Sequence, residues 1–138
     1  MRLDLDVICK DKIFKISQNK SIGDASNCGN IIYDDIDESG NIRMKILKVV
    51  GVNHENKHKD YYVLTFKDVE QNDDEVISIS DRLDEAINYA MSLIIGRDTE
   101  KLKEAKAKKN DVLATLYYGS VKTKLEMFDK LKKTLNIK

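Results

Sequence analysis

Histidine and cysteine are the residue types most able to bind a metal or act as nucleophiles, and this chain holds two of each. His54 and His58 are four residues apart, a spacing that would place both rings on one face of a helix. Cys9 and Cys28 would have to complete a metal site. The segment around the histidines is polar and typical of a loop, and there is no Cys-x-x-Cys pair. We therefore expect no metal site and no cofactor.

Clustered carboxylates are the second source of possible chemistry. Residues 34–38 read Asp-Asp-Ile-Asp-Glu, and residues 73–75 read Asp-Asp-Glu. The first cluster precedes Gly40 but lacks the register of a calcium loop. Polar flanking residues predict that the carboxylates lie in solvated turns with ordinary acidity. The chain also lacks a Gly-x-Ser-x-Gly nucleophile motif. Catalysis is therefore a less favoured class than binding, and we predict no catalytic residues.

Aromatic and basic residues gather on the C-terminal side of Gly96. Aromatic faces, cations and the start of a helix can together hold a phosphate or another anion. The alternative is that the tyrosines only help to cover the core. The residues that would form such a ligand site are Arg97, Tyr117, Tyr118, Lys122 and Lys124.

The lysines of residues 101–133 do not favour nucleic acid. A helix that binds nucleic acid carries its basic residues on one side, whereas these lysines spread around the helix at 100° per residue. Acids lie among them at helical pairing distance, such as Glu104 with Lys108 and Glu126 with Lys130. This pattern is typical of a solvated helix, so nucleic acid is a disfavoured partner.

Composition limits the class of protein further. The formal net charge is zero, but residues 1–80 carry 15 acids against 11 bases, and residues 81–138 carry 9 against 13. Residues 3–6 alternate leucine with aspartate where a signal peptide would need an apolar core. No apolar run in the chain is long enough for a membrane span. We therefore expect a cytoplasmic protein with both thiols reduced and no membrane partner. Abundant Lys, Ile and Asn with no Pro or Trp is typical of a low-GC bacterium or its phage.

The first 80 residues predict a sheet. Period-two alternation and apolar runs bounded by turn residues are typical of strands. Residues 18–30 are a polar loop, Gly40 lies in a turn, and Gly51 is a candidate bulge. The expected strands are residues 3–9, 12–17, 31–36, 42–52, 61–67 and 75–79.

The last 58 residues predict three helices. The first, residues 81–96, has an apolar stripe wide enough to be covered from two directions, and Gly96 would end it. The second would run from about residue 98 to 118 and the third from about 120 to 136, separated at Gly119 and Ser120. The predicted fold class is α+β, with a largely antiparallel sheet of five or six strands followed by three helices. Residues 1–138 would form one domain, with a β-rich half and a helical half.

Three amphipathic helices offer more apolar surface than one small sheet needs. We therefore expect a non-catalytic binding or inhibitor protein, a small accessory factor that binds a protein partner and forms a homo-oligomer, most simply a dimer. The alternative is a binder of an anionic small molecule, such as a signalling nucleotide. The expected interface residues are Leu116, Val121, Leu125, Phe128 and Leu135.

Overall fold

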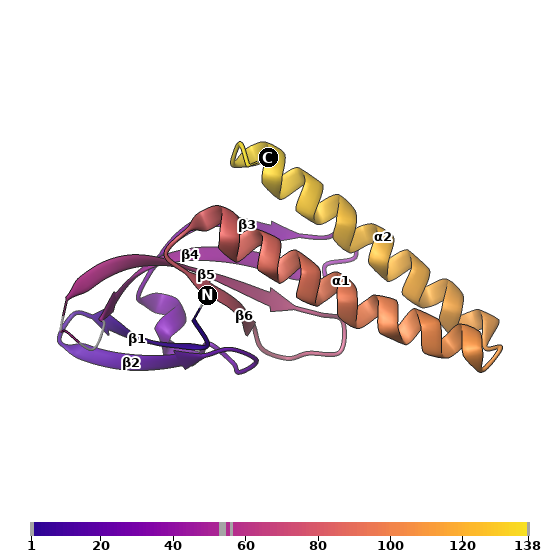
Figure 1. The fold of residues 1–138 in the computed structure, drawn as a ribbon, viewed down its shortest axis with the longest axis horizontal. Coiled ribbons are helices and arrows are strands. Elements are labelled where there is room, and N and C mark those ends of the chain that lie inside the picture. Colours follow the sequence, from indigo (N-terminus) through magenta and orange to yellow (C-terminus); the bar gives the residue numbers. More distant parts are fainter. Residues whose placement is uncertain (1, 53–54, 56, 138) are drawn as a thin grey trace. The chain divides into compact units, whose positions relative to one another are not determined.

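The computed structural model describes residues 2–52, 55 and 57–137. These residues form two compact units, the first running to Asn88 and the second from Tyr89 onward. The division falls inside a helix rather than at the change from strands to helices near residue 80. Figure 1 traces the chain through both units.

In the described part of the chain, six strands form one antiparallel sheet, so the predicted α+β class is confirmed. Five of the six begin and end within one residue of their predicted bounds, whereas β5 begins three residues earlier than predicted. The strands are β1 (Asp4–Cys9), β2 (Lys12–Ser17), β3 (Asn30–Ile36), β4 (Arg43–Val52), β5 (His58–Lys67) and β6 (Glu75–Ser80). A 3-10 helix, η1 (Gly23–Asn27), lies in the predicted loop between β2 and β3.

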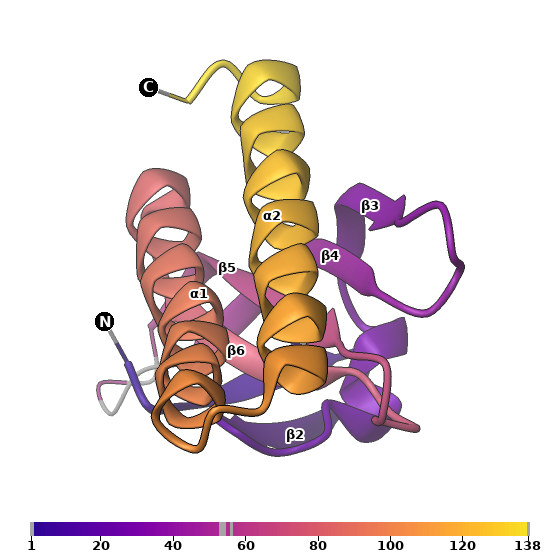
Figure 2. The ribbon, with the colours of Figure 1, turned by 90° about the vertical axis from the view of Figure 1, so that its right-hand side faces the viewer.

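β4 is the central strand of the sheet. It pairs with β5 along its whole length, and its other edge pairs first with β3 and then, at Gly51 and Val52, with β1. The end strands of the sheet are β2 and β6. β6 is bridged in turn by Ser21, just after β2, and by Arg2, just before β1. These bridges close the sheet into a small barrel, and Figure 2 labels β2, β4, β5 and β6 among its strands.

Apolar side chains from alternate positions of the strands fill the barrel. Gly51 faces this core, and its strand keeps a regular register with β5, so the predicted bulge is wrong. A Cβ atom at Gly51 would lie 2.6 Å from Cδ2 of Tyr61 and 2.7 Å from Cδ1 of Leu5. The glycine therefore makes room for neighbouring side chains. The buried core cluster consists of Leu5, Val7, Ile16, Ile22, Ala25, Leu47, Val49, Tyr61, Val63, Val76 and Ile79.

The start of the first α-helix packs on the other face of the sheet. Ser78 is paired with Leu64, so both side chains lie on that face. The Ser78 hydroxyl donates a hydrogen bond to the carbonyl oxygen of Ala86 at 2.8 Å. Ala86 and Ile87 have no exposed surface. The first turns of this helix are therefore anchored to β6 by one buried hydrogen bond and by apolar contact.

The structure contains two α-helices in its described residues, so the prediction of three helices is wrong. They are α1 (Leu83–Ala107) and α2 (Asp111–Thr134). Gly96 and Gly119 lie inside these helices instead of ending them. A glycine ends a helix by adopting a left-handed conformation, and among the described glycines only Gly23 and Gly40 have positive φ.

The break between the helices falls at residues 108–110. Lys109 adopts the left-handed conformation, with φ of 55°. Its N–H donates to the carbonyl of Lys106, and the N–H of Asn110 donates to the carbonyl of Ala105. This is the Schellman arrangement that closes helix ends. The Asn110 side chain then caps α2 by accepting a hydrogen bond from the N–H of Leu113 at 3.2 Å.

Cys9 and Cys28 form a disulfide, which corrects the expectation of two reduced thiols. Their Cα atoms are 5.0 Å apart, within the range that a disulfide requires. Cys9 ends β1, and Cys28 follows η1. The count of two cysteines gave no sign of this pairing, because their proximity depends on how the segment after β2 folds back over the barrel.

Candidate functional site

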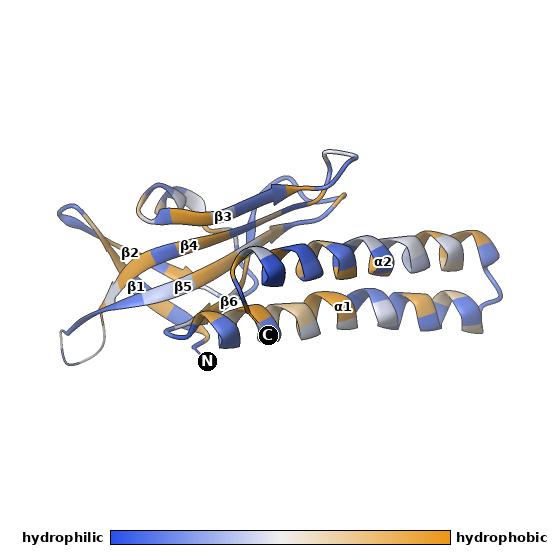
Figure 3. Ribbon diagram, turned by 90° about the horizontal axis from the view of Figure 1, so that it is seen from above, coloured by the Kyte–Doolittle hydropathy of each residue, from blue (hydrophilic) through white to orange (hydrophobic). Residues whose placement is uncertain are grey.

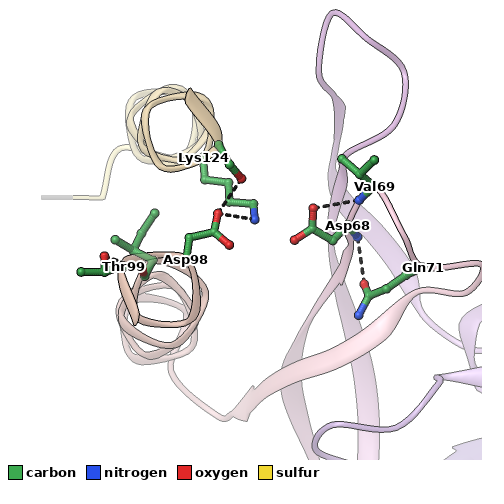
Figure 4. A network of polar contacts seen from close by, with 8 residues as sticks. Asp68, Val69, Gln71, Asp98, Thr99 and Lys124 are labelled. Atoms are coloured by element: carbon green, nitrogen blue, oxygen red, sulfur yellow. Dashed lines mark hydrogen bonds and ion pairs between the residues drawn. The ribbon is translucent and has the colours of Figure 1, made fainter. Parts of the chain in front are cut away.

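The second unit is a helical hairpin held by a buried polar cluster, shown in Figure 4. The ammonium group of Lys124 lies 2.6 Å from a carboxylate oxygen of Asp98, and both side chains are almost wholly buried. The hydroxyl of Ser120 donates to the same oxygen at 2.5 Å. Because Asp98 is on α1 and the other two residues are on α2, the cluster fixes the register of the two helices.

The structure divides the predicted ligand residues into different environments. Lys124 is buried in its ion pair with Asp98 and so does not face solvent. Tyr117 is half-buried, and the ammonium group of Lys101 lies 5.9 Å from the centre of its ring. Arg97 is half-buried on α1, whereas Tyr118 and Lys122 are exposed. Consecutive residues on a helix point about 100° apart, so the side chains of Tyr117 and Tyr118 leave α2 in different directions.

The spacing of residues along α2 carries a signal for the buried lysine that sequence reasoning missed. The buried or half-buried residues that alternate at spacings of three and four include Tyr117, Ser120, Lys124, Met127 and Leu131. Lys124 therefore occupies a position in the apolar seam of the hairpin. A charged residue in such a seam indicates a buried partner of opposite charge, and Asp98 is the acid that α1 provides.

The predicted interface residues are also divided by the structure. Leu116 and Leu125 are 61% and 43% exposed, whereas Phe128 has no exposed surface within the chain. Val121 and Leu135 are half-buried. The predicted interface set does not include Val112 or Tyr118, which are 73% and 64% exposed.

The exposed apolar residues lie on two sides of α2. Val112 and Leu116 are four residues apart and share one side. Tyr118, Val121 and Leu125 follow one another at spacings of three and four on another side, and we call these three residues the α2 strip. Figure 3 shows that hydrophobic and hydrophilic residues are mixed along the length of α2. The strip has the spacing of a helix–helix seam, and two of its three residues are exposed.

The strip has a charged border on one side. At 100° per residue, Lys122 and Asp129 lie at nearly the same angle around α2, beside the strip. Both side chains are exposed. An open hollow further along the helix is lined by residues of both charges, so it does not favour an anion over a cation. Its residues are Glu126, Asp129, Lys130, Lys133 and Thr134.

The first unit has its own charged cluster on the sheet. Arg43 donates two hydrogen bonds to the carboxylate of Asp34, at 3.0 and 2.7 Å. These bonds hold the pKa of Asp34 below its ordinary value. Lys45 lies 3.3 Å from a carboxylate oxygen of Asp74. Each cation of this cluster is thus beside an anion, an arrangement that supports strand pairing more directly than ligand binding.

The predicted turns are also stabilised within the first unit. The carboxylate of Asp37 accepts from the backbone N–H groups of Asn41 and Ile42, around the turn that contains Gly40. In the loop before β6, the side chain of Gln71 accepts from the N–H of Asp68 at 2.8 Å (Figure 4). The Asp37 carboxylate and the Gln71 amide therefore have local structural partners. The described residues include no group of three or more His, Cys, Asp or Glu side chains that could hold a metal ion.

His58 is exposed at the start of β5, while His54 lies outside the described residues. Among the described residues, neither helix is both long and apolar enough to cross a membrane. Comparison with known family models, curated proteins and solved structures finds no match for this chain.

Proposed function

We propose that the chain is a non-catalytic binding protein that acts through α2 and associates with a second copy of itself. The observation that carries the proposal is the α2 strip, where Tyr118 and Leu125 are 64% and 43% exposed. Exposed apolar residues that follow one another at helical spacing are typical of a surface that docks another helix. An inhibitor or accessory factor needs such a surface and no catalytic group.

Charge favours a second copy as the occupant of the strip. In an antiparallel pair of α2 helices centred between residues 125 and 126, residue 122 of one copy lies at the height of residue 129 of the other. In this register the two Leu125 side chains lie near the two-fold axis, and Tyr118 lies at the height of the partner's Lys133. A two-fold axis perpendicular to both helices brings the same border of each strip together. Lys122 would therefore face the partner's Asp129, and this pairing would occur twice in the dimer.

The experiment compares the purified chain with two variants by light scattering and native mass spectrometry. The parent should be a dimer at micromolar concentration. Tyr118→Ser with Leu125→Ser should give a folded monomer, because the change removes apolar contact area from the interface. Val112→Ser with Leu116→Ser, on another side of the same helix, is the matched control and should remain a dimer. A parent chain that is monomeric and stays so on concentration would contradict the proposal.

A second candidate function is the binding of an anionic small molecule. Residues 89–138 contain 12 Lys and Arg but 6 Asp and Glu, so the helical unit has a formal charge of +6. Inorganic phosphate is a suitable probe, and binding to this unit should weaken as salt rises because salt screens exposed charges. Lys122→Ala should weaken phosphate binding, whereas Lys124→Met should change folding stability instead.

A further inference from the structure

The segment between β2 and β3 closes the barrel, and we call residues 18–29 the strap. The N–H of Asn19 donates to the carbonyl of Val76, and the N–H of Val76 donates back to the carbonyl of Lys20. Further along, the N–H of Ile22 donates to the carbonyl of Asp74 at 3.1 Å. The strap thus provides backbone partners for the start of β6 on the edge that does not pair with β5, and Arg2 bonds to Ile79 near the end of the same edge.

The strap also covers part of the barrel core. Ile22 and Ala25 are buried members of the core cluster. Near the end of the strap, a Cβ atom at Gly29 would lie 2.7 Å from Cγ1 of Val49 and 2.9 Å from the carbonyl oxygen of Lys48. The backbone of the strap therefore lies directly on β4, over the core.

The disulfide joins this strap to the end of β1. Cys28 lies in the strap after η1, and Cys9 is the last residue of β1. Both cysteines are half-buried and neither is fully enclosed by the fold. A thiol-exchange site requires this partial exposure. Cys28 also packs against the core cluster. The crosslink thus holds covalently a segment that otherwise depends on a few hydrogen bonds and two buried side chains.

We propose that the Cys9–Cys28 disulfide is a thiol-exchange site that locks the strap, so that reduction opens the strap while the ladder of paired strands stays folded. The co-reactant is a dithiol. One of its thiolates attacks a sulfur of the disulfide, forming a mixed disulfide and releasing the other cysteine as a thiolate, which takes up a proton. The second thiol of the reagent then displaces the remaining cysteine. The dithiol is oxidised to a disulfide, and the protein disulfide is reduced to two thiols.

The hydrogen bonding of the strap explains why its opening would be local. The N-cap residue of the 3-10 helix η1, Ile22, makes no side-chain cap hydrogen bond, and the N–H of Gly23 makes only a long hydrogen bond of 3.4 Å to the hydroxyl of Ser21. The ladder that joins β2, β1, β4, β5 and β6 uses no residue of the strap. Segments with few buried contacts open at lower free energy than the strands of a core. Loss of the crosslink should therefore release the strap first.

Amide hydrogen exchange tests this proposal on the full chain, with dithiothreitol as the dithiol. After reduction, the amides of Asn19 and Ile22, which bond to β6, should exchange faster by on the order of tenfold or more. The amides between β4 and β5 should keep their protection. The variant with Cys9→Ser and Cys28→Ser should exchange like the reduced chain, and dithiothreitol should not change it further.

Three results would overturn the proposal. Unchanged exchange of the strap on reduction would show that the disulfide does not lock it. Equal loss of protection in the strap and between β4 and β5 would show that the disulfide supports the whole barrel instead. If the intact mass of the air-oxidised protein exceeds the mass expected for the disulfide-bonded chain by two hydrogen atoms, the disulfide does not form.

Discussion

A lysine inside a helical hairpin costs free energy unless its charge is paired, and Asp98 provides that pairing for Lys124. The distance of 2.6 Å and the burial of both side chains make this a charge-assisted hydrogen bond shielded from water. The hydroxyl of Ser120 donates to the same carboxylate and so further satisfies it. These three residues determine which register of the two helices leaves no buried charge unpaired.

Removing one partner of this cluster should destabilise the chain more than removing both charges. Asp98→Ala leaves the ammonium of Lys124 buried without its partner and should lower the free energy of unfolding by about 3 kcal/mol or more. Asp98→Leu combined with Lys124→Met should cost much less, because no charge then remains in the hairpin. Urea denaturation of the parent, the single variant and the double variant measures the difference. Equal losses in both variants would show that the hairpin does not bury the pair.

A second prediction at the residue scale concerns pH. Hydrogen bonds from Arg43 are the largest cause of the lowered pKa of Asp34, whose ordinary value is 3.8. A lowered pKa in the folded state means that the pair stabilises the fold above about pH 3.8 and that this contribution is lost as pH falls through the folded-state pKa.

The stabilities of the parent and of Asp34→Asn should therefore converge in acid. Urea unfolding at neutral pH should show the variant to be less stable, by a modest amount because the pair is partly exposed. The difference should shrink as pH falls below the ordinary carboxyl range. Glu38→Gln, which removes an exposed carboxylate in the nearby turn, is the control for overall charge. A difference that stays constant across this pH range would mean that the ion pair does not form.

At the scale of elements, residue patterns predict the strands well and the helix boundaries poorly, for physical reasons. Strand residues alternate between two faces, and turn residues such as Gly40 adopt the positive φ that the turn requires. Helix ends are harder to predict, because the left-handed residue that ends a helix need not be glycine. Lys109 adopts that conformation where α1 ends, while Gly96 and Gly119 remain helical.

Residue patterns are also insufficient to predict the candidate site. Leu116 and Leu125 are exposed and Phe128 and Lys124 are buried, and this division depends on which seam of α2 is covered in the fold. Composition and spacing identify amphipathic helices without identifying which of two adjacent seams is buried. The disulfide is a similar case, because it depends on the path of the strap over the barrel.

Replacing Gly96 or Gly119 by alanine tests whether α1 and α2 continue through these residues, because the change in the free energy of unfolding has opposite signs inside a helix and at a left-handed helix end. A Cβ atom at Gly96 or at Gly119 meets no atom within 4 Å. Alanine in a helix interior is more favourable than glycine by roughly 0.5–1 kcal/mol. Gly96→Ala and Gly119→Ala should each raise the free energy of unfolding by about that amount. Gly51→Ala, whose Cβ would overlap Tyr61 and Leu5, is the contrasting control and should lower it. Destabilisation by Gly96→Ala or Gly119→Ala would instead indicate a left-handed helix end at that residue.

At the scale of the whole molecule, the two units carry opposite formal charges, with 12 bases and 18 acids up to Asn88 and the reverse imbalance from Tyr89 onward. A chain with zero net charge has no long-range field to repel a second copy. Self-association then depends on local contacts, and the proposed dimer supplies apolar contact between the two Leu125 side chains near the axis, with charged pairs at the border of the α2 strip. The border determines which relative orientation of two helices is favourable.

A charge swap tests that orientation. Lys122→Asp would place an acid opposite the partner's Asp129 at two symmetry-related positions, so the dimer should dissociate more readily, by roughly tenfold in its dissociation constant. Adding Asp129→Lys to the same chain reverses both charges and should restore most of the affinity. Lys103→Asp, on the exposed side of α1, makes the same change in net charge and should leave the affinity near that of the parent. Sedimentation equilibrium at low and high salt measures all four proteins, and salt should reduce the differences by screening the border charges. If the double variant is as weak as Lys122→Asp alone, the two side chains do not meet across the interface and the antiparallel arrangement is wrong.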